Sequence, residues 1–123
     1  FRANNGRVGG IFEGAPMLLL HSTGAKSGKK QIKPLMYQYV EDVYAIFASK
    51  AGAPRNPDWY HNLRANPAAS IEVDDKVLNV VAREATGVER DQIWERQKLE
   101  YPNFAEYEHK TDRVIPVIVL EPT

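Results

Sequence analysis

The feature that most restricts the fold of this chain is a series of short apolar or alternating segments, each closed by a turn signal. Alternation of apolar and polar residues buries one face of a strand, and this pattern does not suit a helix. Six such segments fit into 123 residues, which is room for one domain, so we expect a mainly β protein with about six antiparallel strands. The segments cover residues 17–22, 31–39, 43–49, 69–73, 76–84 and 114–121.

The connections between these segments favour a closed sheet. Glu41-Asp42 and Asp74-Asp75 are short polar turns between neighbouring segments and predict hairpins. Closing the sheet into a small barrel leaves no unpaired edge, so we predict a β-barrel with flanking helices. Pro116 lacks a backbone donor and predicts an edge or a bulge in the last strand.

Three helices are expected between the strands. Asn56-Pro57 predicts a helix with Asn56 as its cap, ending before Pro67. Thr86 and Glu89 have the capping-box spacing and open a second helix that runs towards residue 99. A proline at 102 interrupts it, and a short third helix is expected to about residue 109.

Composition excludes several classes of function. With no cysteine there is no disulfide, thiolate metal site or cysteine nucleophile, and the three histidines have no metal-ligand spacing, so no metal is expected. Sixteen basic and sixteen acidic residues give no net charge, which argues against a nucleic-acid partner. No apolar run approaches the roughly 20 residues of a membrane span. We therefore expect a cytoplasmic protein without an integral membrane segment.

A loop at residues 24–30 combines two glycines with three lysines. Its backbone N–H groups can approach an anion, and Lys26, Lys29 and Lys30 add positive charge. The alternative is a plain hairpin turn with solvated lysines. A phosphate-binding loop of the Walker type is excluded by the glycine spacing and by the strand that follows.

A second basic loop at residues 49–56 lies between a buried strand and a helix start, where backbone donors and the helix dipole favour anions. Lys50 and Arg55 strengthen this tendency, although Gly52 and Pro54 also suit a purely structural loop. Two basic loops in one small domain predict a shared site for a small anionic ligand. The aromatics Tyr101, Phe104 and Tyr107 share a helix face and belong either to the core or to the wall of a ligand site.

Several motifs together resemble the deazaflavin-dependent nitroreductase family. They are T-G-A-K-S-G at 23–28, P-L at 34–35, S-K-A-G-A-P-R-N-P-D-W-Y-H-N-L at 49–63, A-N-P at 65–67, A-R at 82–83, Y-P at 101–102 and T-D-R-V-I-P at 111–116. The resemblance runs from about residue 15 to the end of the chain. It implies a split β-barrel of the FMN-binding-like type over residues 15–123, after an N-terminal segment at 1–14 that we expect to be flexible.

This resemblance implies binding of coenzyme F-420, an 8-hydroxy-5-deazaflavin with a phosphate and an oligoglutamate tail, as the hydride donor for a quinone or nitro compound. With the two loops, it assigns to the cofactor site Lys26, Ser27, Gly28, Lys29, Lys30, Pro34, Ser49, Lys50, Ala51, Gly52, Arg55, Asn56, Trp59 and Asn62. By analogy with the family, Ser49, Tyr101 and Tyr107 lie beside the substrate.

The chain departs from the family pattern at three positions. The family often has an arginine where Gln31 stands and tyrosines where Met36 and Phe104 stand. The loss of two hydroxyls favours apolar quinones over polar nitroimidazoles as acceptors. Two alternatives stay open, an FMN-dependent oxidoreductase on the same barrel and a non-catalytic cofactor carrier. A homodimer is implied by related barrels, and peripheral membrane contact is left open.

Overall fold

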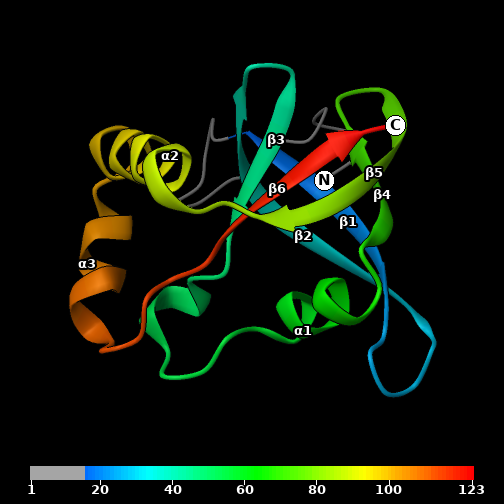
Figure 1. Ribbon diagram of the computed structural model, residues 1–123, viewed down its shortest axis with the longest axis horizontal. Helices are drawn as coiled ribbons and strands as arrows, with labels where there is room; N and C mark the ends of the chain where they lie inside the picture. Colours follow the sequence, from blue (N-terminus) through cyan, green and yellow to red (C-terminus); the bar gives the residue numbers. More distant parts are fainter. Residues whose placement is uncertain (1–15) are drawn as a thin grey trace.

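Six antiparallel strands close into a barrel in the order β1-β2-β3-β6-β5-β4 (Figure 1). The computed structural model describes residues 16–123, so the expected flexible segment at 1–14 lies outside the described residues. The mainly β barrel expected from the sequence is confirmed. The strands are β1 (Met17–Thr23), β2 (Lys30–Val40), β3 (Val43–Phe47), β4 (Ala68–Val73), β5 (Lys76–Glu84) and β6 (Val117–Pro122).

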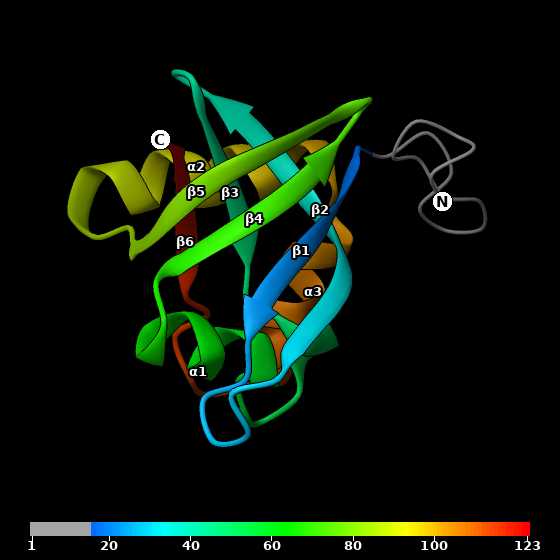
Figure 2. The same ribbon diagram turned by 90° about the vertical axis from the view of Figure 1, so that its right-hand side faces the viewer.

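The barrel interior is filled by one face of each strand. Leu18 and Leu20 of β1 are fully buried in a cluster that also holds Ile46 and Leu120 from β3 and β6. Helix α1 (Asp58–Ala65) lies across one end of the barrel, below the strands in Figure 2, and adds its buried apolar side chains to this cluster. Alternation along the strands thus produces the inner core.

A second core forms on the outside of the barrel. Helices α2 (Gly87–Glu100) and α3 (Asn103–Lys110) lie together at one side of it (Figure 1). Trp94 and Phe104 pack there against Phe47, with ring centroids 5.9 and 5.6 Å from that of Phe47. Parts of β2, β3 and β6 are therefore buried on both faces, one against the interior and one against these helices, while residues 30–34 of β2 are exposed.

The expected hairpins are present. Glu41 and Asp42 form the tight turn between β2 and β3, and both have positive φ angles, 48° and 68°. A two-residue turn with both φ angles positive matches the twist of the strands that it joins.

Two local expectations were wrong. Pro116 lies just before β6 rather than at an edge or bulge within it, and its carbonyl accepts a hydrogen bond from Ala48 N at 3.0 Å. A closed sheet has no free edge where a residue without a backbone N–H could stand. The proline therefore lies just before the strand begins. Asn56 does not cap α1; the cap position is Pro57, and the Asn56 side chain accepts a hydrogen bond from Arg113 instead.

Thr86 does stand at the cap of α2, but without a side-chain cap hydrogen bond. The Glu89 carboxylate, expected in the capping box, pairs with Arg83 at 2.6 Å. Among residues 16–123, no helix combines the length and the apolar character needed to cross a membrane.

Candidate active site

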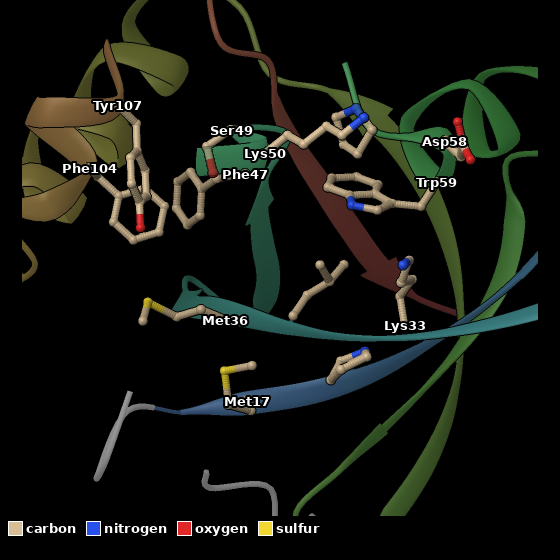
Figure 3. A pocket seen from close by; sticks show the side chains of 13 residues that line it. Met17, Lys33, Met36, Phe47, Ser49, Lys50, Asp58, Trp59, Phe104 and Tyr107 are labelled. Atoms are coloured by element: carbon tan, nitrogen blue, oxygen red, sulfur yellow. The ribbon is translucent and has the colours of Figure 1, made fainter. Parts of the chain in front are cut away.

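A cavity of about 490 Å³ opens where β1, β2 and the end of β3 meet the start of α1 and helix α3 (Figure 3). The cavity lies beside the barrel end that α1 covers. Its lining includes Trp59 from the inner core and Phe104 from the outer core. It is lined by Met17, Lys33, Pro34, Leu35, Met36, Phe47, Ser49, Lys50, Pro57, Asp58, Trp59, Phe104 and Tyr107.

One side of this cavity is apolar. Met17 and Met36 lie on neighbouring strands and face the rings of Phe47, Phe104 and Tyr107 across the cavity (Figure 3). The ring centroids of Phe104 and Tyr107 are 5.3 Å apart in an edge-on arrangement. Thioethers and aromatic rings together make a polarisable surface that suits a flat apolar molecule.

The opposite side is polar and cationic. Lys33 on β2 and Lys50 in the loop after β3 carry the positive charges, and Trp59 stands between them in Figure 3. Asp58, at the first position of α1, also lines this side. Both lysines are exposed, so water and salt partly screen the attraction between their charges and an anionic ligand.

A second cavity, of about 610 Å³, shares the lining residue Asp58 with the first. Its other lining residues are Gly24, Ala25, Lys26, Ser27, Gln31, His61 and Asn62. The loop between β1 and β2 therefore faces the first two turns of α1 across this cavity.

Asn62 holds the two walls of the second cavity together. Its buried side-chain oxygen accepts a hydrogen bond from Ala25 N at 2.9 Å, and its amide nitrogen donates to Gln31 Oε1 at 3.1 Å. Gln31 is thus part of this link. The amide of Asn62 fixes the loop that carries Lys26.

The loop at 49–56 reaches the first cavity in a bent conformation. It contains the short 3-10 helix η3 (Lys50–Gly52), with φ angles of 45° at Lys50 and 80° at Gly52. Gly52 is required by close packing as well as by its φ angle, since a Cβ there would lie 2.8 Å from Lys110 Cβ and 3.0 Å from Tyr107 O. The loop is therefore pressed against α3.

Arg113 is a residue whose role sequence reasoning missed. It donates to Ser49 O at 2.9 Å, to Ala53 O at 3.0 Å and to Asn56 Oδ1 at 2.6 Å. Burial lowers the pKa of its guanidinium. The only sequence signal was its place in the T-D-R-V-I-P stretch, which gave no hint of the loop that it contacts.

The two hydroxyl groups along the first cavity come from Ser49 and Tyr107 (Figure 3). Ser49 is buried, at 8% exposure. The Tyr107 hydroxyl accepts a hydrogen bond from Asn103 Nδ2 at 3.0 Å, which leaves its own proton free to donate.

Most of the remaining residues assigned from sequence do not line either cavity. Gly28 and Lys29 lie at the exposed tip of the first loop, and Lys30 lines a separate groove with His21 and Ser70. Within the second loop, Gly52, Arg55 and Asn56 support or flank the lining residues, and Ala51 is part of η3. Tyr101 packs against the outer core and is absent from both linings.

The residues present suit a ligand with a flat ring and an anionic extension. A flat ring would lie in the first cavity, beside Trp59 and the hydroxyls of Ser49 and Tyr107. An anionic extension would meet Lys33 and Lys50 there and Lys26 in the second cavity. This donor set is the one that a deazaflavin with a phosphate and a carboxylate tail requires.

Comparison with known proteins gives the same indication. The F420H(2)-dependent quinone reductase of Mycobacterium tuberculosis (strain ATCC 25618 / H37Rv) is 42% identical over 124 residues, which cover 98% of this chain and 83% of that protein. A solved structure described as F420-H2 dependent reductase (FDR-A) has a TM-score of 0.79 and 48% identity, covering 86% of this chain and 94% of that one. Another, described as a domain-swapped dimer, has the same TM-score and identity and covers 86% of this chain and 80% of the other.

The sequence model of one family, described as F420H(2)-dependent quinone reductase, matches residues 1–122. That span includes both basic loops, the aromatic helix and every residue along the two cavities. The chain belongs to the F420H(2)-dependent quinone reductase family and is an oxidoreductase that depends on reduced coenzyme F-420.

Proposed function

We propose that the two cavities hold coenzyme F-420 and an apolar quinone, and that the chain promotes hydride transfer from the reduced cofactor to the quinone. The observation that carries this proposal is the division of the first cavity into a cationic side and an apolar side, with a second cavity that shares Asp58 with the first and adds Lys26. A cofactor with an anionic tail and an apolar acceptor need these two environments next to each other.

On the cofactor side, the chain supplies charge and placement. Lys26, Lys33 and Lys50 would meet the phosphate and carboxylates, and Trp59 and Pro34 would contact the ring. Lys29, Lys30 and Arg55 are exposed nearby in sequence and add longer-range attraction for the tail. When bound in its reduced form, the cofactor supplies the hydride, so the protein's part is to orient, to exclude water and to place donors.

On the acceptor side, Met17, Met36 and Phe104 form a wall without hydroxyl groups. The Ser49 and Tyr107 hydroxyls are the proposed donors to the acceptor oxygen, on which negative charge develops as the hydride arrives. Tyr101, assigned to the substrate side by family analogy, is the third candidate, and its place behind the cavity ranks it below the other two.

The apolar wall favours quinones over nitro compounds. A polar nitroimidazole ring would lose water on binding to thioethers and a phenylalanine without gaining hydrogen bonds from them. Nitro compounds are therefore proposed as secondary acceptors. A homodimer is also proposed, and the related structure described as a domain-swapped dimer supports it. We further propose a cytoplasmic location and peripheral contact with a membrane that holds the quinone.

The test is steady-state turnover of the full chain with reduced F-420 and either menadione or a bicyclic nitroimidazole. We expect kcat/KM to be higher for menadione by about ten-fold, the effect of one unpaired polar group in the pocket. Faster nitroimidazole reduction would contradict the proposed acceptor. Tight F-420 binding without turnover of either acceptor would indicate the cofactor carrier instead.

A further inference from the structure

The guanidinium of Arg113 spans the loop that brings Ser49 and Lys50 to the cavity. We propose that Arg113 is the positioning residue for this loop, holding it in the shape that presents Lys50 to the cofactor and Ser49 to the acceptor. This role rests on the function proposed above for the cavity, and Arg113 itself is absent from the lining of both cavities.

The three hydrogen bonds of Arg113 reach the start, the middle and the end of the loop. Nη2 donates to Ser49 O at 2.9 Å, Nε to Ala53 O at 3.0 Å and Nη1 to Asn56 Oδ1 at 2.6 Å. A planar guanidinium holds its donors in a fixed fork, so three simultaneous bonds fix the relative positions of the three acceptors. A lysine ammonium, a single point donor on a flexible stem, does not reproduce this geometry.

The loop needs such support because its backbone is strained. Lys50 has a φ angle of 45°, in the left-handed region that disfavours side chains other than glycine. Local bonds from Gly52 N to Ser49 O and from Ala53 N to Lys50 O shape the turn, at 2.9 and 3.0 Å. Arg113 adds a second donor to the Ser49 carbonyl and so secures the same turn from outside.

A purely electrostatic role is the first alternative. All three acceptors of Arg113 are neutral oxygens, so its positive charge is not cancelled by them and would attract an anionic cofactor. Arg113→Lys separates the two roles, because it keeps the charge and removes the fork. If Arg113 has a positioning role, this variant should lose the ordered loop and bind F-420 more weakly, although it keeps the positive charge.

A general contribution to folding is the second alternative, and Arg90 provides the matched control. It is also partly buried and donates from Nη2 to a backbone carbonyl, that of Ile115 at 2.8 Å, two residues along from Arg113. It lines neither cavity that we assign to the ligands. Arg90→Lys therefore reports the cost of losing a comparable arginine–carbonyl bond away from the loop.

The first experiment uses the protein without cofactor and follows amide hydrogen exchange at Gly52 and Ala53 by NMR. In Arg113→Lys we expect both amides to exchange roughly ten-fold faster than in wild type, the loss that corresponds to one charge-assisted hydrogen bond. Arg90→Lys should leave them unchanged. Asn56→Ala, which removes only one acceptor, should show a smaller increase and serves if Arg113→Lys does not fold. Unchanged exchange in both loop variants would overturn the positioning role.

The second experiment measures the dissociation constant of oxidised F-420 for Lys50→Ala, Arg113→Lys and the double variant. Because Arg113 acts through Lys50, the double variant should bind no more than about two-fold more weakly than the weaker single variant. Independent, multiplicative losses, or an Arg113→Lys affinity equal to wild type, would overturn the proposal. If wild type does not bind F-420, the proposed function fails, while the exchange result still decides whether Arg113 holds the loop.

Discussion

At the scale of single residues, the hydroxyl of Tyr107 is the group best prepared to act on an acceptor. Asn103 Nδ2 donates to it at 3.0 Å, so one lone pair is occupied and the O–H bond is free to point elsewhere. The ring is fixed edge-on to Phe104, which restricts the directions open to the hydroxyl. A donor whose orientation is set before the substrate binds loses little entropy when it stabilises developing charge.

Tyr107→Phe keeps the ring and removes only this donor. We expect kcat for menadione to fall by roughly ten- to a hundred-fold, while the F-420 dissociation constant stays within about two-fold of wild type. Stopped-flow and binding measurements on the same preparations check both numbers. Tyr39→Phe, which removes an exposed hydroxyl bonded to Asp42, is the control. Tyr101→Phe should have a smaller effect than Tyr107→Phe, and the reverse order would place the donor at Tyr101.

The sequence identified some residues of the site better than others. Lys26, Lys50 and Trp59 stand in loops or at a helix start with strong local signals, and the structure places all three along the cavities. Met17 and Phe47 line the cavity too, but within strands they read only as apolar positions. Which strand residues face a cavity depends on strand pairing and helix packing, and neither is a local property.

At the scale of elements, helix α3 supplies Phe104 and Tyr107 to the first cavity and is held to α2 by polar contacts. Trp94 Nε1 donates to Glu108 Oε2 at 2.5 Å, and Lys98 Nζ lies 3.2 Å from the other carboxylate oxygen. Burial raises the pKa of Glu108, but the hydrogen bonds from Trp94 and Lys98 outweigh it and hold the pKa below the ordinary value of 4.5. The carboxylate form is therefore favoured in the folded protein.

A depressed folded-state pKa contributes stability above the unfolded value, and this stability is lost as the pH falls through the folded value. Glu108→Gln should therefore lower the free energy of unfolding by about 1 kcal/mol at neutral pH. The difference should shrink at acidic pH, as the pH falls through the lowered pKa of Glu108 and the wild-type carboxylate becomes protonated too. Thermal unfolding at both pH values measures it, with the exposed Glu106→Gln on the same helix as control. A difference independent of pH would mean that the Glu108 charge is not what fastens α3.

The presence of the strands and of the hairpins between neighbouring strands followed from the sequence, because turn residues act locally. Glu41-Asp42 and Asp74-Asp75 lie in the hairpins that their composition predicted. The conformation of the 49–56 loop did not follow, because Arg113, which holds it, is about sixty residues away in the chain. The same contact explains the missed cap, since it engages the Asn56 side chain that was expected to close α1.

At the scale of the whole molecule, equal numbers of basic and acidic residues conceal an uneven distribution. Lys26, Lys33 and Lys50 line the two cavities, where Asp58 is the acidic lining residue. Glu89, Glu108 and Glu121, by contrast, are paired with basic side chains away from them. A neutral protein can thus present a locally positive path to an anionic ligand without attracting polyanions in general.

This distribution predicts selectivity between two related cofactors. FMN carries a phosphate but no oligoglutamate tail, so it leaves the second cavity and Lys26 unused. We expect oxidised F-420 to bind at least about ten-fold more tightly than FMN at low salt, which is the free energy of one charge-assisted hydrogen bond. Fluorescence titration at about 0.05 and 0.5 M salt should show the gap narrowing as screening increases. Lys26→Gln should weaken F-420 binding and leave FMN binding unchanged, because Lys26 lines only the second cavity. Equal affinity for the two cofactors in wild type would contradict the assignment of the second cavity to the tail.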